Sequence, residues 1–266
     1  MAEPTEFVNR PLDITYLLNY MEQQAAANPL YRSLNLKQVG VIGQSFGGYT
    51  ALALAGAPIN FQQLQQACQN LDNTFNLSLL LQCRAQQLEQ QGQTRTDFRD
   101  PRVSAVIAMN PINSAVMGQA NLGLIQIPIM MVTGSADTVA PSLFEQVQPF
   151  TWLTVGDRYL VQMDPGTHFS VIGGGEIPGS GGALVIPPEV IGPNPASAQR
   201  YINALSLAFF QTYIANRPTF RTYLTAAYAQ TISDPALRLD LVRTVTANQL
   251  ALITNQPLPQ LANLYK

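Results

Sequence analysis

Residues 38–56 read QVGVIGQSFGGYTALALAG, and this stretch decides the fold. Gln38–Ile42 is a short apolar run typical of a buried parallel strand, and the small residues of Gly47–Gly56 predict a helix. Between them, Gly43-Gln44-Ser45-Phe46-Gly47 has the pattern G-x-S-x-G. After a strand and before a helix, this pattern predicts a nucleophile elbow, a strained turn that lifts the serine above the sheet. We expect Gly43 and Gly47 to be required because side chains there would collide across the turn. The alternative is a glycine-rich turn with an incidental serine.

Outward from this stretch, short apolar strands alternate with helices, which is the pattern of an α/β protein with a mainly parallel sheet. Further strands are expected at Val103–Met109, Ile127–Val132 and Arg158–Met163. Helices are expected at Pro11–Ala27, Ala198–Ile214, Phe220–Gln230 and Pro235–Gln249, and an extended tail at Leu250–Lys266. The chain has no internal repeat and no linker, so residues 1–266 are predicted to form a single domain.

Two segments interrupt the alternation of strands and helices. Residues 57–100 are rich in Gln and Asn yet keep helical apolar spacing, which predicts a helical, lid-like insertion. Residues 172–197 are rich in Gly and Pro, and their glycines would permit the movement of a flap. The alternative is that both are ordinary surface loops. Residues 198–266 are predicted to form C-terminal helices and the tail.

A serine hydroxyl is a weak nucleophile and needs a neighbouring base. His168 is the only histidine of the chain, and it follows the last of the four apolar strands, where such folds place the base. The acid that orients it must lie between Ser45 and His168, because the chain order of such sites is Ser, Asp or Glu, His. Asp137 follows a strand at the carboxyl end of the sheet, where catalytic groups collect. Asp137 is therefore the predicted acid, and Asp164, in the loop of His168, is the alternative.

Composition argues against several classes of function. The chain has 14 Lys+Arg, 16 Asp+Glu and a formal net charge of −2, without clustered cations, so no nucleic-acid partner is expected. No run approaches the roughly 20 apolar residues of a membrane span, and Met1–Arg10 has no apolar core of a signal peptide. Two cysteines and one histidine are too few for a Cys/His zinc site or a His-rich metal centre. No metal is therefore expected.

Together these segments resemble the α/β-hydrolase superfamily. They look closest to bacterial proteins described as predicted dienelactone hydrolases, which are related to platelet-activating-factor acetylhydrolases. The resemblance covers about residues 9–168 and rests on Asn9–Asp13 (NRPLD), Ile42–Gly48 (IGQSFGG), Asp100–Val103 (DPRV), Gly134–Asp137 (GSAD) and Gly166–Phe169 (GTHF). It implies an α/β-hydrolase fold with Ser45, Asp137 and His168 as the catalytic triad. It implies the branch that uses serine, since true dienelactone hydrolases carry cysteine at the elbow.

One feature departs from the pattern of the superfamily. Its members begin with several strands before the elbow strand, and a loop among them, often with a His-Gly pair, supplies one N–H of the oxyanion hole. Here 38 residues precede Val39, and they predict one helix and a connector without a His-Gly pair. The backbone N–H of Phe46 can serve as one oxyanion donor, and the loss of its partner can cost about 10²–10³ in turnover. We therefore expect an amino-terminally incomplete hydrolase.

In such a hydrolase the strand Gln38–Ile42 would expose a flat apolar edge with unpaired backbone groups. Edges of this kind template aggregation. The isolated chain is therefore expected to be poorly soluble, self-associated or inactive, unless a partner chain completes the sheet.

The predicted function is the hydrolysis of a carboxylic ester, either a small-molecule ester or a lipid, without a cofactor. Ser45 would attack the ester carbonyl while His168 accepts its proton, and water would then release the acyl group. A serine peptidase or a thioesterase would use the same residues, because specificity lies in the shape of the pocket. The interpretation from a different class is a non-catalytic relic or an interaction module.

Two cysteines, Cys68 and Cys83, lie in the lid-like insertion. A disulfide between them would tie two helices together and would indicate an oxidising compartment, periplasmic or secreted. The alternative is a pair of buried free thiols, since cysteine packs as a small hydrophobic residue.

Overall fold

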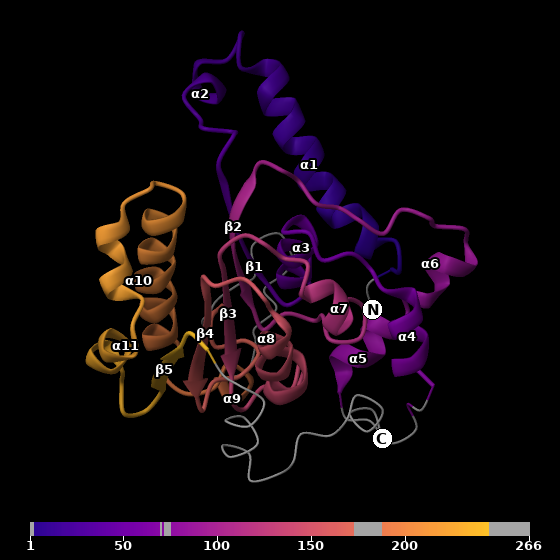
Figure 1. Ribbon diagram of the computed structural model, residues 1–266. Helices are drawn as coiled ribbons and strands as arrows, with labels where there is room; N and C mark the ends of the chain where they lie inside the picture. The colour runs from indigo at the N-terminus through magenta and orange to yellow at the C-terminus, as the bar shows by residue number, and fades with distance from the viewer. Residues whose placement is uncertain (1–2, 70, 72–75, 173–187, 245–266) are drawn as a thin grey trace.

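The computed structural model of the protein describes residues 3–69, 71, 76–172 and 188–244. Its centre is a five-stranded sheet in the order β1-β2-β3-β4-β5 (Figure 1). The strands are β1 (Val39–Gln44), β2 (Val103–Met109), β3 (Ile129–Gly134), β4 (Arg158–Asp164) and β5 (Arg238–Val242). The first four are parallel, and β5 runs antiparallel to β4. The predicted α/β class is confirmed, and each of the four predicted strands lies within two residues of its expected bounds. Among the described residues, β1 forms one edge of the sheet.

Helices cover both faces of the sheet (Figure 1). Alternate residues of β2 show the division, because Val106 and Ala108 pack into one core cluster and Ala105 and Ile107 into the other. The first cluster takes buried side chains from α1 (Glu6–Gln24), α3 (Phe46–Leu54), α4 (Phe61–Ala67), α5 (Leu77–Cys83), α6 (Gln86–Gln90), α7 (Gly118–Leu122) and α8 (Gln148–Trp152). The second takes them from α10 (Pro195–Tyr213), α11 (Ala226–Ile232) and β5. The remaining short helices are α2 (Pro29–Arg32), the π-helix η1 (Leu143–Val147), α9 (Pro188–Ile191) and the 3₁₀-helix η2 (Pro218–Tyr223). None of the described helices has both the length and the apolar character needed to cross a membrane.

The opening helix starts earlier than the sequence predicts. α1 begins at Glu6 instead of Pro11, so the proline lies inside the helix. A proline in a helix removes one backbone hydrogen bond. Phe7 and Val8 in the first turn are buried, and the Phe7 ring packs against Phe46 of α3 with ring centroids 4.6 Å apart. Burial of a large apolar side chain stabilises by about 1.5–3 kcal/mol, which offsets the lost bond.

Two predictions near the C-terminus need correction. The expected helix Phe220–Gln230 is divided into η2 and α11, and the Thr225 side chain caps α11 by accepting the N–H of Tyr228 at 3.3 Å. The expected helix Pro235–Gln249 is wrong, because residues 238–242 form β5. Leu239 and Leu241 are buried while Arg238, Asp240 and Val242 are exposed, which is the period of a strand and not of a helix. Residues 245–249 and the predicted tail Leu250–Lys266 lie outside the described residues, as does most of the predicted flap.

The lid-like insertion contains α4, α5 and α6 and packs against the first core cluster. Leu64, Leu79 and Leu88, one from each helix, are buried there. A disulfide joins Cys68, directly after α4, to Cys83, the last residue of α5. Apolar packing therefore holds the insertion against the core, and the disulfide ties two of its helices to each other.

Candidate active site

The turn between β1 and α3 carries Ser45 in a strained conformation. Its backbone has φ 56° and ψ −117°, which is unusual for a residue other than glycine. The N–H of Ser45 donates to the carbonyl oxygen of Met109 at the end of β2, at 2.8 Å, so the turn is tied to the neighbouring strand. This geometry agrees with the predicted elbow, in which the strand ends abruptly and the serine is presented above the sheet.

The two glycines of the pentapeptide are not equivalent. A Cβ atom at Gly43 would lie 2.1 Å from the carbonyl oxygen of Gly47, so only glycine fits at position 43. A Cβ atom at Gly47 would have no neighbour within 4 Å. The expectation that a side chain at Gly47 would collide is therefore wrong, because its Cβ direction leads into open space and not across the turn.

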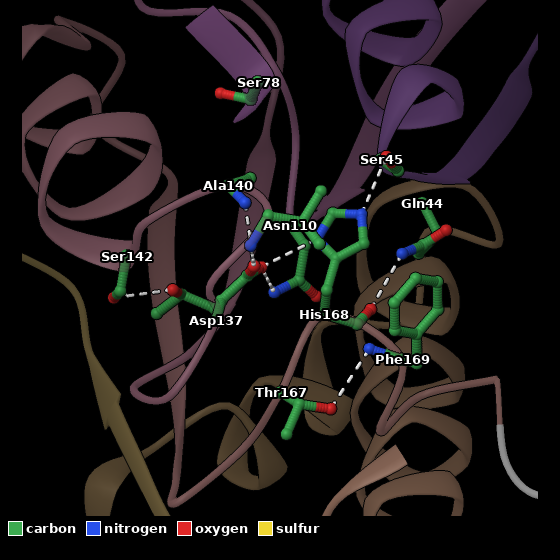
Figure 2. A network of polar contacts seen from close by, with 12 residues as sticks. Gln44, Ser45, Ser78, Asn110, Asp137, Ala140, Ser142, Thr167, His168 and Phe169 are labelled. Atoms are coloured by element: carbon green, nitrogen blue, oxygen red, sulfur yellow. Dashed lines mark hydrogen bonds and ion pairs between the residues drawn. The ribbon is translucent and has the colours of Figure 1, made fainter. Parts of the chain in front are cut away.

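The predicted base, nucleophile and acid come together at the carboxyl ends of the parallel strands (Figure 2). The distance from Nε2 of His168 to Oγ of Ser45 is 2.8 Å, and from Nδ1 of His168 to Oδ2 of Asp137 it is 2.7 Å. A carboxylate only accepts hydrogen bonds, so Nδ1 carries the proton and Nε2 is free to accept the serine hydroxyl. The side chains of His168 and Asp137 are 4% and 0% exposed, while Ser45 is half-buried. Water is thus largely excluded from the pair of His168 and Asp137, whereas Ser45 stays partly accessible.

The turn after β3 holds the carboxylate of Asp137 in one orientation. Its Oδ1 accepts the backbone N–H groups of Val139 and Ala140, each at 2.8 Å. Its Oδ2 accepts the side-chain amide of Asn110 at 2.8 Å, in addition to the imidazole N–H of His168. Four donors therefore surround the two carboxylate oxygens.

Close backbone contact positions the loop of His168 against the loop of Asp137. A Cβ atom at Gly134 would lie 2.4 Å from the carbonyl oxygen of Gly166, and that oxygen accepts the N–H of Ala136 at 2.8 Å. The side-chain amide of Gln44, the residue before Ser45, donates to the backbone carbonyl of His168 at 2.9 Å. Ser45, His168 and Asp137 are therefore linked through the backbone of their loops as well as through their side chains.

Asp164, the alternative acid, has other partners. It accepts hydrogen bonds from the side chains of Ser135 and Arg238. The hydrogen bond from Ser135, followed by the one from Arg238, lowers the pKa of the Asp164 carboxyl below its ordinary value. The imidazole N–H of His168 donates to Asp137 and not to Asp164, so the geometry favours Asp137, the first choice from the sequence.

Asn110 is the site residue that the sequence analysis missed. It follows β2 directly and is 1% exposed, and a polar residue before Pro111 at the carboxyl end of a strand was the signal available. Within the described residues, no group of three or more His, Cys, Asp or Glu side chains is placed to hold a metal ion. Chemically, the arrangement can transfer a proton from Ser45 to His168 and stabilise the charge that forms on the imidazole.

No family model matches the chain, and no curated protein matches it either.

Proposed function

We propose that this protein is a serine hydrolase of the α/β-hydrolase type that cleaves carboxylic esters through an acyl-enzyme on Ser45. The observation that carries the proposal is the hydrogen-bonded series Asp137–His168–Ser45, mounted on a strained turn between a strand and a helix. Such a series is recognised by geometry and roles and recurs on unrelated folds. The nucleophile elbow, and the chain order Ser, Asp, His, favour the α/β-hydrolase type among them.

Each residue has a defined role in the proposed reaction. Oγ of Ser45 attacks the carbonyl carbon of the ester while Nε2 of His168 takes the hydroxyl proton. The tetrahedral intermediate collapses, the alcohol leaves with that proton, and the acyl group stays on Ser45. A water molecule, deprotonated by the same nitrogen, then releases the carboxylic acid. Asp137 fixes the tautomer of the imidazole and stabilises its positive charge during both steps.

The developing oxyanion needs N–H donors. The N–H of Phe46 is the first of α3 and has no acceptor within its own helix. The positive end of a helix dipole also favours an anion at that position. We therefore assign Phe46 as one oxyanion donor.

The test is labelling and kinetics with matched variants. A fluorophosphonate probe should label the wild-type protein at Ser45, and p-nitrophenyl acetate should be hydrolysed. Ser45→Ala should abolish labelling and lower kcat by roughly 10⁴-fold or more, and Asp137→Asn should lower kcat by roughly 10²–10⁴-fold. Ser206→Ala on α10 and Asp164→Asn serve as controls and should retain activity. Hydrolysis that survives Ser45→Ala, or a larger loss in Asp164→Asn than in Asp137→Asn, would refute the assignment.

A further inference from the structure

Asn110 occupies the position between the nucleophile strand and the acid strand. It follows β2, which has β1 on one side and β3 on the other. Its N–H donates to the carbonyl oxygen of Val132 in β3 at 2.8 Å, and the carbonyl of Met109 before it accepts the N–H of Ser45. Its backbone is left-handed, with φ 43°, which asparagine tolerates better than most residues other than glycine. The peptide group between Met109 and Asn110 is therefore bonded on one side to the turn of Ser45 and on the other to the strand that precedes Asp137.

The side chain of Asn110 points at the oxygen that orients the base (Figure 2). Its Nδ2 lies 2.8 Å from Oδ2 of Asp137, and Nδ1 of His168 lies 2.7 Å from the same atom. The other oxygen, Oδ1, is saturated by two backbone N–H groups of its own turn. Oδ2 of Asp137 thus accepts two hydrogen bonds, one from the imidazole of His168 and one from Asn110, which lies outside the turn of Asp137.

A shared acceptor has two physical consequences. The amide of Asn110 restricts rotation of the carboxylate, so Oδ2 stays in line with Nδ1 of His168. It also draws electron density from Oδ2, because a donor to a carboxylate stabilises its negative charge and weakens its pull on other positive partners. The amide therefore sets both the direction and the strength of the interaction between Asp137 and the imidazolium.

From this geometry we infer that Asn110 is a positioning residue, which tunes His168 through Asp137. The inference rests on the proposed function for its kinetic consequence, but its effect on the imidazole can be measured without any substrate. His168 is the only histidine of the chain, so the ring signals of a ¹⁵N-labelled protein without a polyhistidine tag report on it directly.

Two variants of Asn110 and one control make the test. Asn110→Gly removes the amide and keeps the left-handed backbone. Asn110→Asp keeps the volume, leaves less room for a replacing water and sets a second carboxyl group against Asp137. Asn216→Gly is the matched control, because Asn216 has the same left-handed backbone, with φ 53°, and is exposed away from the triad.

We expect the titration midpoint of the imidazole, followed by NMR, to rise by roughly 0.5–1 pH unit in Asn110→Gly and to rise also in Asn110→Asp. The reason is that a carboxylate without its amide donor, or with a second carboxylate beside it, stabilises the imidazolium more strongly. The acidic limb of kcat/KM against pH should move in the same direction. At neutral pH kcat should fall about 10- to 100-fold with KM unchanged, the range that one lost hydrogen bond to a charged group allows. Asn216→Gly should match the wild type in every measurement.

The positioning role of Asn110 and the proposed function can be refuted separately. If both Asn110 variants titrate like the wild type, the positioning role of Asn110 is overturned, whatever the activity. If the titration moves as expected while the wild-type protein neither hydrolyses esters nor reacts with fluorophosphonate, the orientation of the imidazole by Asn110 stands and the proposed function is overturned.

Discussion

Replacement of Glu145 by glutamine should destabilise the protein far more than an exposed replacement of the same type. Glu145 lies in η1 and is 0% exposed. Its Oε1 accepts the side chains of Asn76, Gln82 and Ser114 at 2.9–3.0 Å, and its Oε2 accepts the backbone N–H groups of Asn113 and Ser114 at 3.0 and 3.1 Å. All five donors are neutral. Hydrogen bonds alone therefore compensate this buried carboxylate for the hydration that it loses on folding.

The magnitude follows from the choices open to a glutamine. If its NH₂ group replaces Oε2, it faces two backbone N–H groups that cannot turn away. If it replaces Oε1, it faces amides whose own oxygens are engaged, since Oε1 of Gln82 accepts the N–H groups of Ala115 and Val116. Either orientation removes at least two hydrogen bonds to a charged group, each worth about 1.5–3 kcal/mol. The expected loss in the free energy of unfolding is therefore about 3–6 kcal/mol, which lowers Tm by at least about 6 °C in a chain of this size.

Urea denaturation measures this loss. Fluorescence of Trp152, the only tryptophan, reports on α8 directly after η1, and far-UV circular dichroism tests whether the transition is two-state. Glu89→Gln in α6 is the control, because Glu89 is exposed and accepts one side-chain hydrogen bond, from Gln65. It should change the free energy of unfolding by less than about 0.5 kcal/mol. A loss below about 1 kcal/mol in Glu145→Gln, with an unchanged m-value, would refute the reasoning.

Two further predictions concern the turn that carries Ser45 and the carboxyl group of Asp100. Gly43→Ala should abolish fluorophosphonate labelling of Ser45 because its Cβ meets the backbone of Gly47, whereas Gly47→Ala should label at nearly the wild-type rate; equal labelling of the two would contradict this account of the turn. The hydrogen bond from Arg102 lowers the pKa of Asp100 in the folded protein, so this carboxyl contributes stability above its ordinary pKa that is lost as pH falls through the lowered value. Asp100→Asn should therefore flatten the fall in Tm between about pH 5 and pH 3, and an unchanged slope would argue against this contribution.

The sequence predicts the helices and strands of this fold well where the apolar residues follow one clear pattern along the segment. β2, β3 and much of β4 are apolar runs buried on both faces, and such runs are visible without the structure. β1 is also recognisable as a short apolar run, although at the edge of the sheet its Gly40 and Ile42 are exposed. The sequence predicts a helix where the antiparallel strand β5 lies, because this segment follows a helical one. Its alternation of Leu239 and Leu241 with exposed residues covers only five positions, which is too short to outweigh helical context.

The candidate site divides in the same way. Ser45, Asp137 and His168 could be predicted because each lies at the end of a strand and the order of their types along the chain is restricted. Asn110 could not be assigned a partner, because its contact with Asp137 joins residues 27 positions apart and depends on the order of strands in the sheet. Hydrophobic periodicity identifies elements, but it contains no information on which polar side chain meets which across neighbouring strands.

Two buried carboxylates, Asp137 and Glu145, differ in the groups that donate hydrogen bonds to them. Asp137 and Glu145 have almost the same exposure, 5% and 0%, so burial does not separate them. Three neutral donors hold Asp137, and its fourth partner is the imidazole of His168, whose charge can change during a reaction. Neutral donors fixed by the surrounding fold fill the positions around Glu145, two of them from the lid-like insertion. Displacement of α5 would strip this carboxylate of part of its hydrogen bonding at a cost of several kcal/mol. Glu145 therefore fastens the insertion to the body of the protein, whereas Asp137 is the buried carboxylate that contacts an imidazole, as the proposed function requires.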